Sequence, residues 1–144
     1  MKVEIVCVGK LKKEFIPLDS FYQKRVSNFT QFDIIEVKEG EKEAVENNLK
    51  TRLKKEFYKI AFSPEAKQVK DEYFFSQIFS QQARIQFFIG GDDGLTSDFI
   101  KSCDEIVSLS SLIFPHQLFR IMLLEQIYRG FSIVKGHPYH RSTA

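Results

Sequence analysis

The sequence contains no tryptophan and only two cysteines, Cys7 and Cys103, among its 144 residues. A disulfide-stabilised secreted domain would need more cysteines, so we expect two free, buried thiols. No apolar run approaches the roughly 18 residues that a membrane-spanning helix requires. No basic segment is followed by an apolar stretch and a small-residue cleavage site, as in a secretory signal. These absences predict a cytoplasmic protein with no membrane partner.

Charge of one sign is also scarce, because 21 basic and 19 acidic residues leave a net charge of only +2. This balance argues against a protein that binds a polyanion with its whole surface. The distribution is less even, since no acidic residue follows Glu125 while Arg129, Lys135 and Arg141 remain. A basic end of this kind also arises by chance, so charge alone does not predict a nucleic-acid partner.

Several catalytic motifs are missing as well. The sequence has no GxSxG, no HExxH and no phosphate-binding GxGxxG or Walker loop, which argues against common hydrolases and nucleotide-binding enzymes. Two of its three histidines, His137 and His140, lie close together, but no acidic residue or thiol follows to act as a third ligand. Zinc sites need three or four such ligands, so we expect no metal.

Apolar runs of strand length alternate with longer segments of helical periodicity along the chain. Strands are expected at residues 2–8, 32–37, 59–62, 85–89 and 105–109, and helices at residues 12–29, 41–58, 69–80, 96–103 and 115–134. The alternation is typical of an α/β fold. It predicts a single domain over residues 1–144, with a mostly parallel sheet and helices on both faces.

The helix expected at residues 115–134 has almost no polar face. A surface helix of a small α/β domain usually shows an apolar stripe about 100° wide. A helix that is apolar all round must be covered on two sides, and one sheet covers only one of them. We therefore favour a homodimer through this C-terminal helix. The alternative is a central helix buried within one chain.

Three segments carry residues that could bind a ligand or take part in chemistry. Residues 88–94 (FIGGDDG) follow an expected strand, and their glycines would let a ligand lie against bare backbone. Residues 109–116 (LSSLIFPH) follow another strand and mix hydroxyls with apolar side chains. Residues 136–141 (GHPYHR) offer histidine, tyrosine and arginine. Each alone is equally compatible with a plain turn, a capped helix or a polar tail.

Together these segments resemble one family. IGGDDG, LSSLIFPHQLFRIMLLEQIYRGFSI and HPYHR are similar, at the same spacing, to the bacterial large-subunit ribosomal RNA pseudouridine N3-methyltransferases of the SPOUT superfamily. A weaker similarity reaches the N-terminal CVGK run, so the resemblance covers essentially the whole chain. It implies a homodimer and a C-terminal trefoil knot, a topology that general rules of chain connection disfavour.

The resemblance also implies S-adenosylmethionine as the methyl donor and assigns its contacts by position. These contacts are Phe62, Gly90, Leu109, Ser110, Ser111, Leu112, Ile113 and Phe114. Three positions depart from the family pattern, which usually has leucine near Phe62, glycine at Ala66 and threonine at Ile113. Without the threonine hydroxyl, we expect the contact at Ile113 to be made by backbone or packing.

The implied reaction is methylation of N3 of a pseudouridine in large-subunit ribosomal RNA. We interpret His140 as the acceptor or relay of the N3 proton, Arg141 as a phosphate or imide contact, and Tyr139 as a residue that positions or stacks the base. The small chain has no separate RNA-binding domain, which favours the assembled ribosome as the substrate. The alternatives are a SPOUT methyltransferase for another RNA nucleotide and a non-enzymatic dimeric binding or assembly module.

Overall fold

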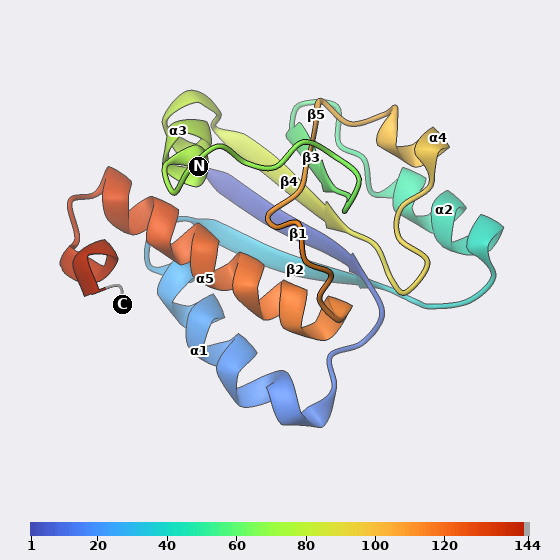
Figure 1. The fold of residues 1–144 in the computed structure, drawn as a ribbon, viewed down its shortest axis with the longest axis horizontal. Coiled ribbons are helices and arrows are strands. Elements are labelled where there is room, and N and C mark those ends of the chain that lie inside the picture. Colours follow the sequence, from blue (N-terminus) through green and yellow to red (C-terminus); the bar gives the residue numbers. More distant parts are fainter. Residues whose placement is uncertain (143–144) are drawn as a thin grey trace.

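A five-stranded parallel sheet forms the centre of the molecule (Figure 1). The computed structural model describes residues 1–142. All strand pairs are parallel, in the order β2-β1-β4-β3-β5. The strands are β1 (Lys2–Val8), β2 (Gln31–Val37), β3 (Tyr58–Phe62), β4 (Arg84–Ile89) and β5 (Glu105–Val107). The α/β fold and the parallel sheet expected from the sequence are therefore confirmed.

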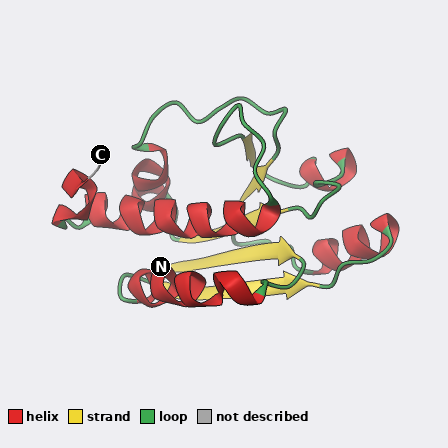
Figure 2. Ribbon diagram, turned by 60° about the horizontal axis from the view of Figure 1, so that its bottom comes forward, coloured by secondary structure: helices red, strands yellow, loops and turns green. Residues whose placement is uncertain are grey.

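Helices pack against both faces of the sheet (Figure 2). Helices α1, α3 and α5 share one apolar core with the sheet, and α2 and α4 share the other. The helices are α1 (Ile16–Ser27), α2 (Lys42–Thr51), α3 (Phe74–Gln81), α4 (Ser97–Ile100) and α5 (His116–Val134). The short 3-10 helices η1 (Lys13–Phe15) and η2 (Pro138–Ser142) precede α1 and follow α5.

Successive residues of the central strands contribute to opposite cores. Ile5 and Phe87 belong to the core beneath α1, α3 and α5, whereas Val6 and Phe88 belong to the core beneath α2 and α4. All four side chains are fully buried. A parallel sheet covered on both faces needs apolar residues at consecutive positions, which explains the continuous apolar runs in the sequence.

Helix α2 is shorter than the sequence pattern predicts, because a tertiary contact ends it. We expected a helix over residues 41–58, but it ends at Thr51 and Tyr58 already belongs to β3. The backbone N–H of Lys54 donates to the buried side-chain oxygen of Gln86 on β4, at 3.1 Å. This hydrogen bond holds the chain in a turn that helical periodicity does not reveal.

Helix α3 begins at Phe74, several residues later than the start expected at position 69. The preceding segment instead runs beside the chain that leaves β5. The backbone N–H of Val69 donates to the carbonyl of Ser108 at 2.8 Å, and the N–H of Ser108 donates to the carbonyl of Lys67 at 3.0 Å. The segments after β3 and β5 are therefore held side by side (Figure 1).

Most of the apolar surface of α5 is covered within one chain. The helix lies between α1 and α3 and against the sheet, and the rings of Phe131 and Phe79 stack with centroids 4.0 Å apart. Gly130 permits this approach, since a Cβ there would lie 2.8 Å from atoms of Phe75 and Phe79. The apolar composition of α5 alone therefore does not require a second copy. Among residues 1–142, no helix has the length and apolarity needed to cross a membrane.

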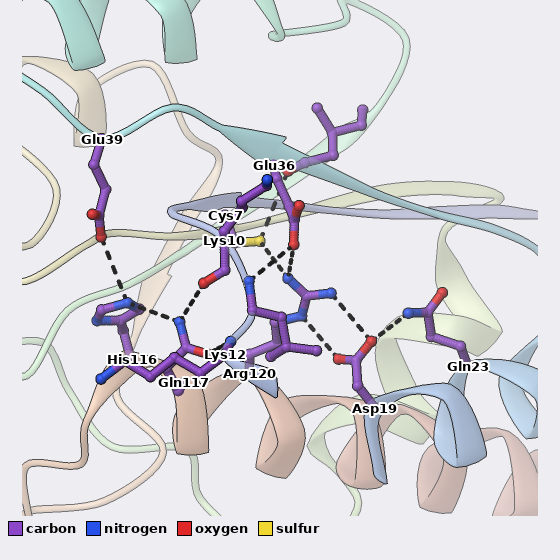
Figure 3. A network of polar contacts seen from close by, with 12 residues as sticks. Cys7, Lys10, Lys12, Asp19, Gln23, Glu36, Glu39, His116, Gln117 and Arg120 are labelled. Atoms are coloured by element: carbon purple, nitrogen blue, oxygen red, sulfur yellow. Dashed lines mark hydrogen bonds and ion pairs between the residues drawn. The ribbon is translucent and has the colours of Figure 1, made fainter. Parts of the chain in front are cut away.

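A buried ion network anchors the first half of α5 (Figure 3). The guanidinium of Arg120 donates to both carboxylate oxygens of Asp19 on α1, at 2.9 and 3.1 Å, and to Glu36 on β2 at 2.6 Å. Arg120 and Asp19 are both buried. Cys7 lies against the same guanidinium, but burial raises the pKa of its thiol to about 11, so it is uncharged at neutral pH. The thiol therefore adds no negative charge, and the guanidinium faces the carboxylates of Asp19 and Glu36.

Arg120→Met is expected to lower the free energy of unfolding by about 3–5 kcal/mol, because it leaves the buried Asp19 carboxylate without its cation. Denaturant unfolding followed by circular dichroism measures this change. Arg84→Met is the matched control, since its 3.7 Å ion pair with Glu56 is exposed and should contribute less than about 1 kcal/mol. Equal losses in the two variants would contradict the anchoring role of Arg120.

A candidate active site at the carboxyl edge of the sheet

The chain segments that follow β3, β4 and β5 meet at one edge of the sheet and enclose a cavity of about 670 Å³. This edge lies at the carboxyl ends of the parallel strands, where α/β folds usually bind their ligands. The volume falls within the range typical of small-molecule sites. The start of α5, from Pro115 to Phe119, forms the remaining wall.

The cavity brings together seven of the eight residues expected to contact the methyl donor. They are Phe62, Gly90, Leu109, Ser110, Leu112, Ile113 and Phe114. Ser111, the eighth, is exposed and does not line the cavity. Three segments thus surround one space, although 28 positions separate Phe62 from Gly90 and 19 separate Gly90 from Leu109. The strand order, which places β3 between β4 and β5, brings them together.

The glycine segment after β4 folds back on itself with no space for a side chain at its first position. A Cβ on Gly90 would lie 2.5 Å from the carbonyl carbon of Gly94 and 2.7 Å from the nitrogen of Leu95. The N–H of Gly94 donates to the carbonyl of Gly91 at 2.9 Å, and Gly94 has a φ of +71°, which favours glycine. Bare backbone therefore lines this side of the cavity.

Serine hydroxyls shape the opposite wall. The Ser108 hydroxyl donates to the carbonyl of Ser110 at 2.7 Å, and the Ser110 hydroxyl accepts from the N–H of Leu112 at 3.0 Å. These local bonds turn the chain so that Leu112 and Ile113 stand 67% and 83% exposed beside the cavity. In one chain, this wall is apolar and uncovered.

The chemistry of the lining suits a ligand that has an apolar ring and cationic or hydroxyl groups. The rings of Phe62 and Phe119 meet edge to face at 5.3 Å and give one side an aromatic surface. Glu65, Asp92 and Asp93 supply carboxylates, and no lysine or arginine of the described part of the chain lines the cavity. Such a lining attracts a sulfonium or ammonium group and repels phosphate. The residues present therefore fit S-adenosylmethionine.

His116 lines the cavity, although no sequence pattern assigned it a role. Its Nδ1 lies 3.0 Å from the Asp92 carboxylate of the glycine segment. Its Nε2 lies 3.8 Å from the carboxylate of Glu39, a contact seen in Figure 3. The next residue, Gln117, accepts from the N–H of Lys12 at 2.6 Å and donates to the carbonyl of Lys10 at 2.7 Å. The start of α5 thus contacts the glycine segment that lines the cavity and the loops that follow β1 and β2.

The expected catalytic tail lies elsewhere. Its helix, η2, folds against the C-terminal half of α5, where the Tyr139 hydroxyl donates to Glu125 at 2.8 Å and the ring of Tyr139 packs on Tyr128. His140 is half-buried and contacts Arg129. The side chain of Arg141 lies outside the described residues. Among the residues that the structure describes, no group of three acidic, cysteine or histidine side chains could hold a metal ion.

Tyr139 serves as a hydrogen-bond donor in this arrangement. Burial, and then the hydrogen bond to Glu125, raises the pKa of Tyr139 above its usual range, so its phenol keeps its proton at neutral pH. Its hydroxyl is engaged with Glu125, and the Arg129 guanidinium lies 5.0 Å from the ring centroid. Tyr139 therefore anchors the tail to α5.

The tail and the cavity contact different parts of α5. Tyr139 contacts Glu125 and His140 contacts Arg129, which follow His116 by 9 and 13 residues, or about 14 and 20 Å along the helix at a rise of 1.5 Å per residue. Pro115 and His116 line the cavity at its first turn, whereas η2 follows its last turn. Tyr139 and His140 of one chain therefore cannot reach the cavity of the same chain in this conformation.

Gly90→Val is expected to weaken S-adenosylmethionine binding about ten- to a hundredfold, because the side chain would displace Gly94 and Leu95 at a cost of roughly 1–3 kcal/mol. The added Cβ meets the loop itself, not the space of the ligand. Titration calorimetry measures the affinity. Gly40→Ala is the control, since its Cβ would meet nothing within 4 Å. Equal affinity in wild type and Gly90→Val would exclude the cavity as the donor site.

Comparisons with known proteins identify the family of this chain. The chain is 36% identical to the ribosomal RNA large subunit methyltransferase H of Clostridium kluyveri, over 98% of this chain and 100% of the relative. It is 39% identical to the methyltransferase H of Streptococcus uberis, over the same shares of the two chains.

Solved structures share the fold at low sequence identity. A probable methylase family protein from Haemophilus influenzae is 11% identical, with a TM-score of 0.58 over 94% of this chain and 69% of that chain. A family model described as a predicted SPOUT methyltransferase matches residues 1–140. The chain therefore belongs to the SPOUT methyltransferase family.

Proposed function

We propose that this protein transfers a methyl group from S-adenosylmethionine to N3 of a pseudouridine in large-subunit ribosomal RNA. The observation that carries the proposal is the end-to-end match to relatives named for methylation of this RNA. The cavity supports it, since seven residues assigned to the donor by sequence surround one space. The choice of pseudouridine and of N3 comes from the family resemblance of residues 88–141.

Different lining residues suit different chemical groups of the donor. Phe62, Leu109 and Phe119 offer apolar surface to the adenine ring, and the backbone at Gly90 lets the ligand approach closely. The carboxylates of Asp92 and Asp93 suit hydroxyl and ammonium groups. When bound, the donor supplies a methyl group already activated by a positive sulfur. The protein's task is then to align the base with that methyl group and exclude water.

The working unit in this proposal is a homodimer in which the tail of one chain completes the cavity of the other. The length of α5 separates the two parts within one chain, which supports this arrangement. Large apolar residues also remain exposed on α1 and α5: Ile16, Leu18, Phe21 and Leu118. A groove beside them is lined by Leu18, Tyr22, Ile121 and Met122. A second copy would bury this surface.

The proposal also includes a trefoil knot, with the segment after β5 threaded through the loop after β3. The backbone bonds between Ser108 and residues 67 and 69 hold these two segments in contact and support the proposal. Threading would place Ser110, in the segment after β5, and Phe62, at the end of β3, beside Gly90. In this view, the knot is what makes one cavity from three separate connections.

An assembled ribosome is the substrate that best suits this chain. The net charge is only +2. The methyltransferase family model matches residues 1–140, which leaves no stretch among them for an added RNA-binding domain. A preformed surface reduces the number of contacts that the enzyme must supply for specificity. A ribosomal substrate also places the reaction in the cytoplasm.

Intact ribosomes, free ribosomal RNA and transfer RNA offered with radiolabelled S-adenosylmethionine test this function. We expect incorporation into ribosomes only, with the modified nucleotide mapped by mass spectrometry to N3 of one pseudouridine. Labelling of another nucleotide would identify a different SPOUT methyltransferase. No thermal shift at millimolar donor, together with no labelling, would instead support the non-enzymatic assembly module.

Two inactive variants test the composite site. Deletion of residues 138–144 should abolish methyl transfer but leave donor affinity nearly unchanged, because the cavity lies at the other end of α5. Gly90→Val keeps the tail but disrupts donor binding in the cavity. Mixing the two after joint refolding should restore about a quarter of wild-type activity, since half of the random dimers carry one intact pair. A mixture as inactive as its parts would place tail and cavity in the same chain and contradict the proposal.

A further inference from the structure

A chain of polar contacts leads from the middle of α5 to the tail histidine. The carboxylate of Glu125 accepts from the guanidinium of Arg129 at 2.7 Å, one helical turn further along. Another nitrogen of the same guanidinium lies 3.3 Å from Nδ1 of His140. All three residues are half-buried. The carboxylate therefore fixes the arginine, and the arginine meets one particular nitrogen of the histidine.

Arg129 has little freedom to turn away from His140. Its guanidinium is bonded to Glu125 on one side and lies over the ring of Tyr139, 5.0 Å from the centroid. Glu125 is itself held by the Tyr139 hydroxyl at 2.8 Å and by the side chain of Gln126 at 2.7 Å. The orientation of the guanidinium is thus set by several contacts rather than by one.

This contact decides which nitrogen of His140 carries the proton. A guanidinium has five N–H donors and no acceptor, so the atom it faces must offer a lone pair. Nδ1 of His140 is therefore unprotonated, and the proton of the neutral ring resides on Nε2. A doubly protonated ring would bring N–H against N–H. Among the described residues, Nε2 makes no hydrogen bond and is available to a ligand.

We propose that Arg129 holds His140 as the neutral Nε2–H tautomer, so that His140 donates a hydrogen bond to the target base and does not accept its N3 proton. This inference rests on the proposed function and changes the role that the sequence suggested for His140. N3 of a uracil ring lies between two carbonyl groups. A donor beside either oxygen stabilises the negative charge that spreads over the imide once N3 is deprotonated.

The reaction balances without a protein base. The N3 proton leaves to solvent water before the base closes on the donor, and the electron pair on N3 then forms the new bond to the methyl carbon. The bond from that carbon to sulfur breaks, and its electron pair stays on the sulfur, whose positive charge is lost. His140 holds the same proton before and after transfer. Arg129 and Glu125 act as positioning residues, since neither touches the base in this scheme.

Glutamine and alanine at position 140 separate a donor from a base. The glutamine amide can donate from near the place of Nε2 but cannot take a proton, whereas alanine can do neither. We expect the kcat of His140→Gln to stay within about tenfold of wild type, and that of His140→Ala to fall further. A proton acceptor would instead lose about a hundredfold or more in both variants. Equal, large losses in His140→Gln and His140→Ala would overturn the proposal.

The pH dependence of turnover gives a second readout that a structural role would not move. The groups facing His140 are Arg129 and, behind it, Glu125 from α5, and Tyr73, whose ring centroid is 6.0 Å away at the start of α3. If the N3 proton leaves to solvent, the ratio of wild-type to His140→Gln kcat/KM should stay constant as the pH rises above neutrality. A ratio that falls with rising pH, because solvent then deprotonates N3 in place of the imidazole, would show that His140 accepts the proton.

Nitrogen-15 NMR of the imidazole rings tests the tautomer without any substrate. The chain has only three histidines, so the signal lost in His140→Gln identifies His140. We expect Nε2–H in wild type and a mixture of tautomers in Arg129→Gln. His137→Gln serves as the spectral control, since Nδ1 of His137 accepts from the N–H of Tyr139 at 3.2 Å and does not meet Arg129. A proton on Nδ1 of His140 in wild type would refute the proposed tautomer, even if ribosomes are methylated. If the tautomer is as expected but ribosomes are not methylated, only the proposed function is refuted.

Discussion

The buried ion pair between Arg120 and Asp19 fixes where α5 begins, and the position of α5 governs both parts of the candidate site. Its first turn carries His116 and Gln117, which join the glycine segment and the loop after β1 to the cavity. Its second half carries Glu125 and Arg129, which hold the tail. Burying a cation and a carboxylate is costly unless each is fully paired, so the geometry of this contact is restricted. Because α5 is one continuous helix, fixing the position of Arg120 also fixes the positions of the α5 residues that line the cavity and hold the tail.

The cavity follows from the strand order more than from any single motif. In a parallel sheet, every strand delivers its carboxyl end to the same edge, and the order β4-β3-β5 brings three connections together. The Ser108 backbone then joins the connection after β5 to that after β3. Acidic side chains and bare backbone at this edge select against phosphate and for a positively charged ligand. Family membership and cavity chemistry thus agree through independent observations.

The tail illustrates how a residue's surroundings define its chemical role. A histidine in a polar C-terminal segment suggests proton transfer, because its unperturbed ring titrates near neutral pH. Beside the Arg129 guanidinium, the same ring has one nitrogen committed as an acceptor, which leaves the other as a donor. Tyr139 likewise becomes an anchor, since its hydroxyl is bonded to Glu125 and its ring packs against Tyr128. The separation of this cluster from the cavity gives the proposed dimer a physical reason beyond the apolar surface of α5.

The sequence by itself determined the strands, the alternation that makes the fold α/β, and the glycine and serine segments of the cavity, because strand burial and backbone freedom leave local patterns. It also overestimated the length of α2 and placed the start of α3 too early, since Gln86 and Ser108 act on those segments from distant strands. Only the tertiary structure decided that α1 and α3 cover most of α5, that His116 and Phe119 line the cavity, and that Arg129 faces Nδ1 of His140. Each of these depends on residues far apart in the chain, whose contacts arise from strand order and helix packing and leave no periodic trace in the sequence.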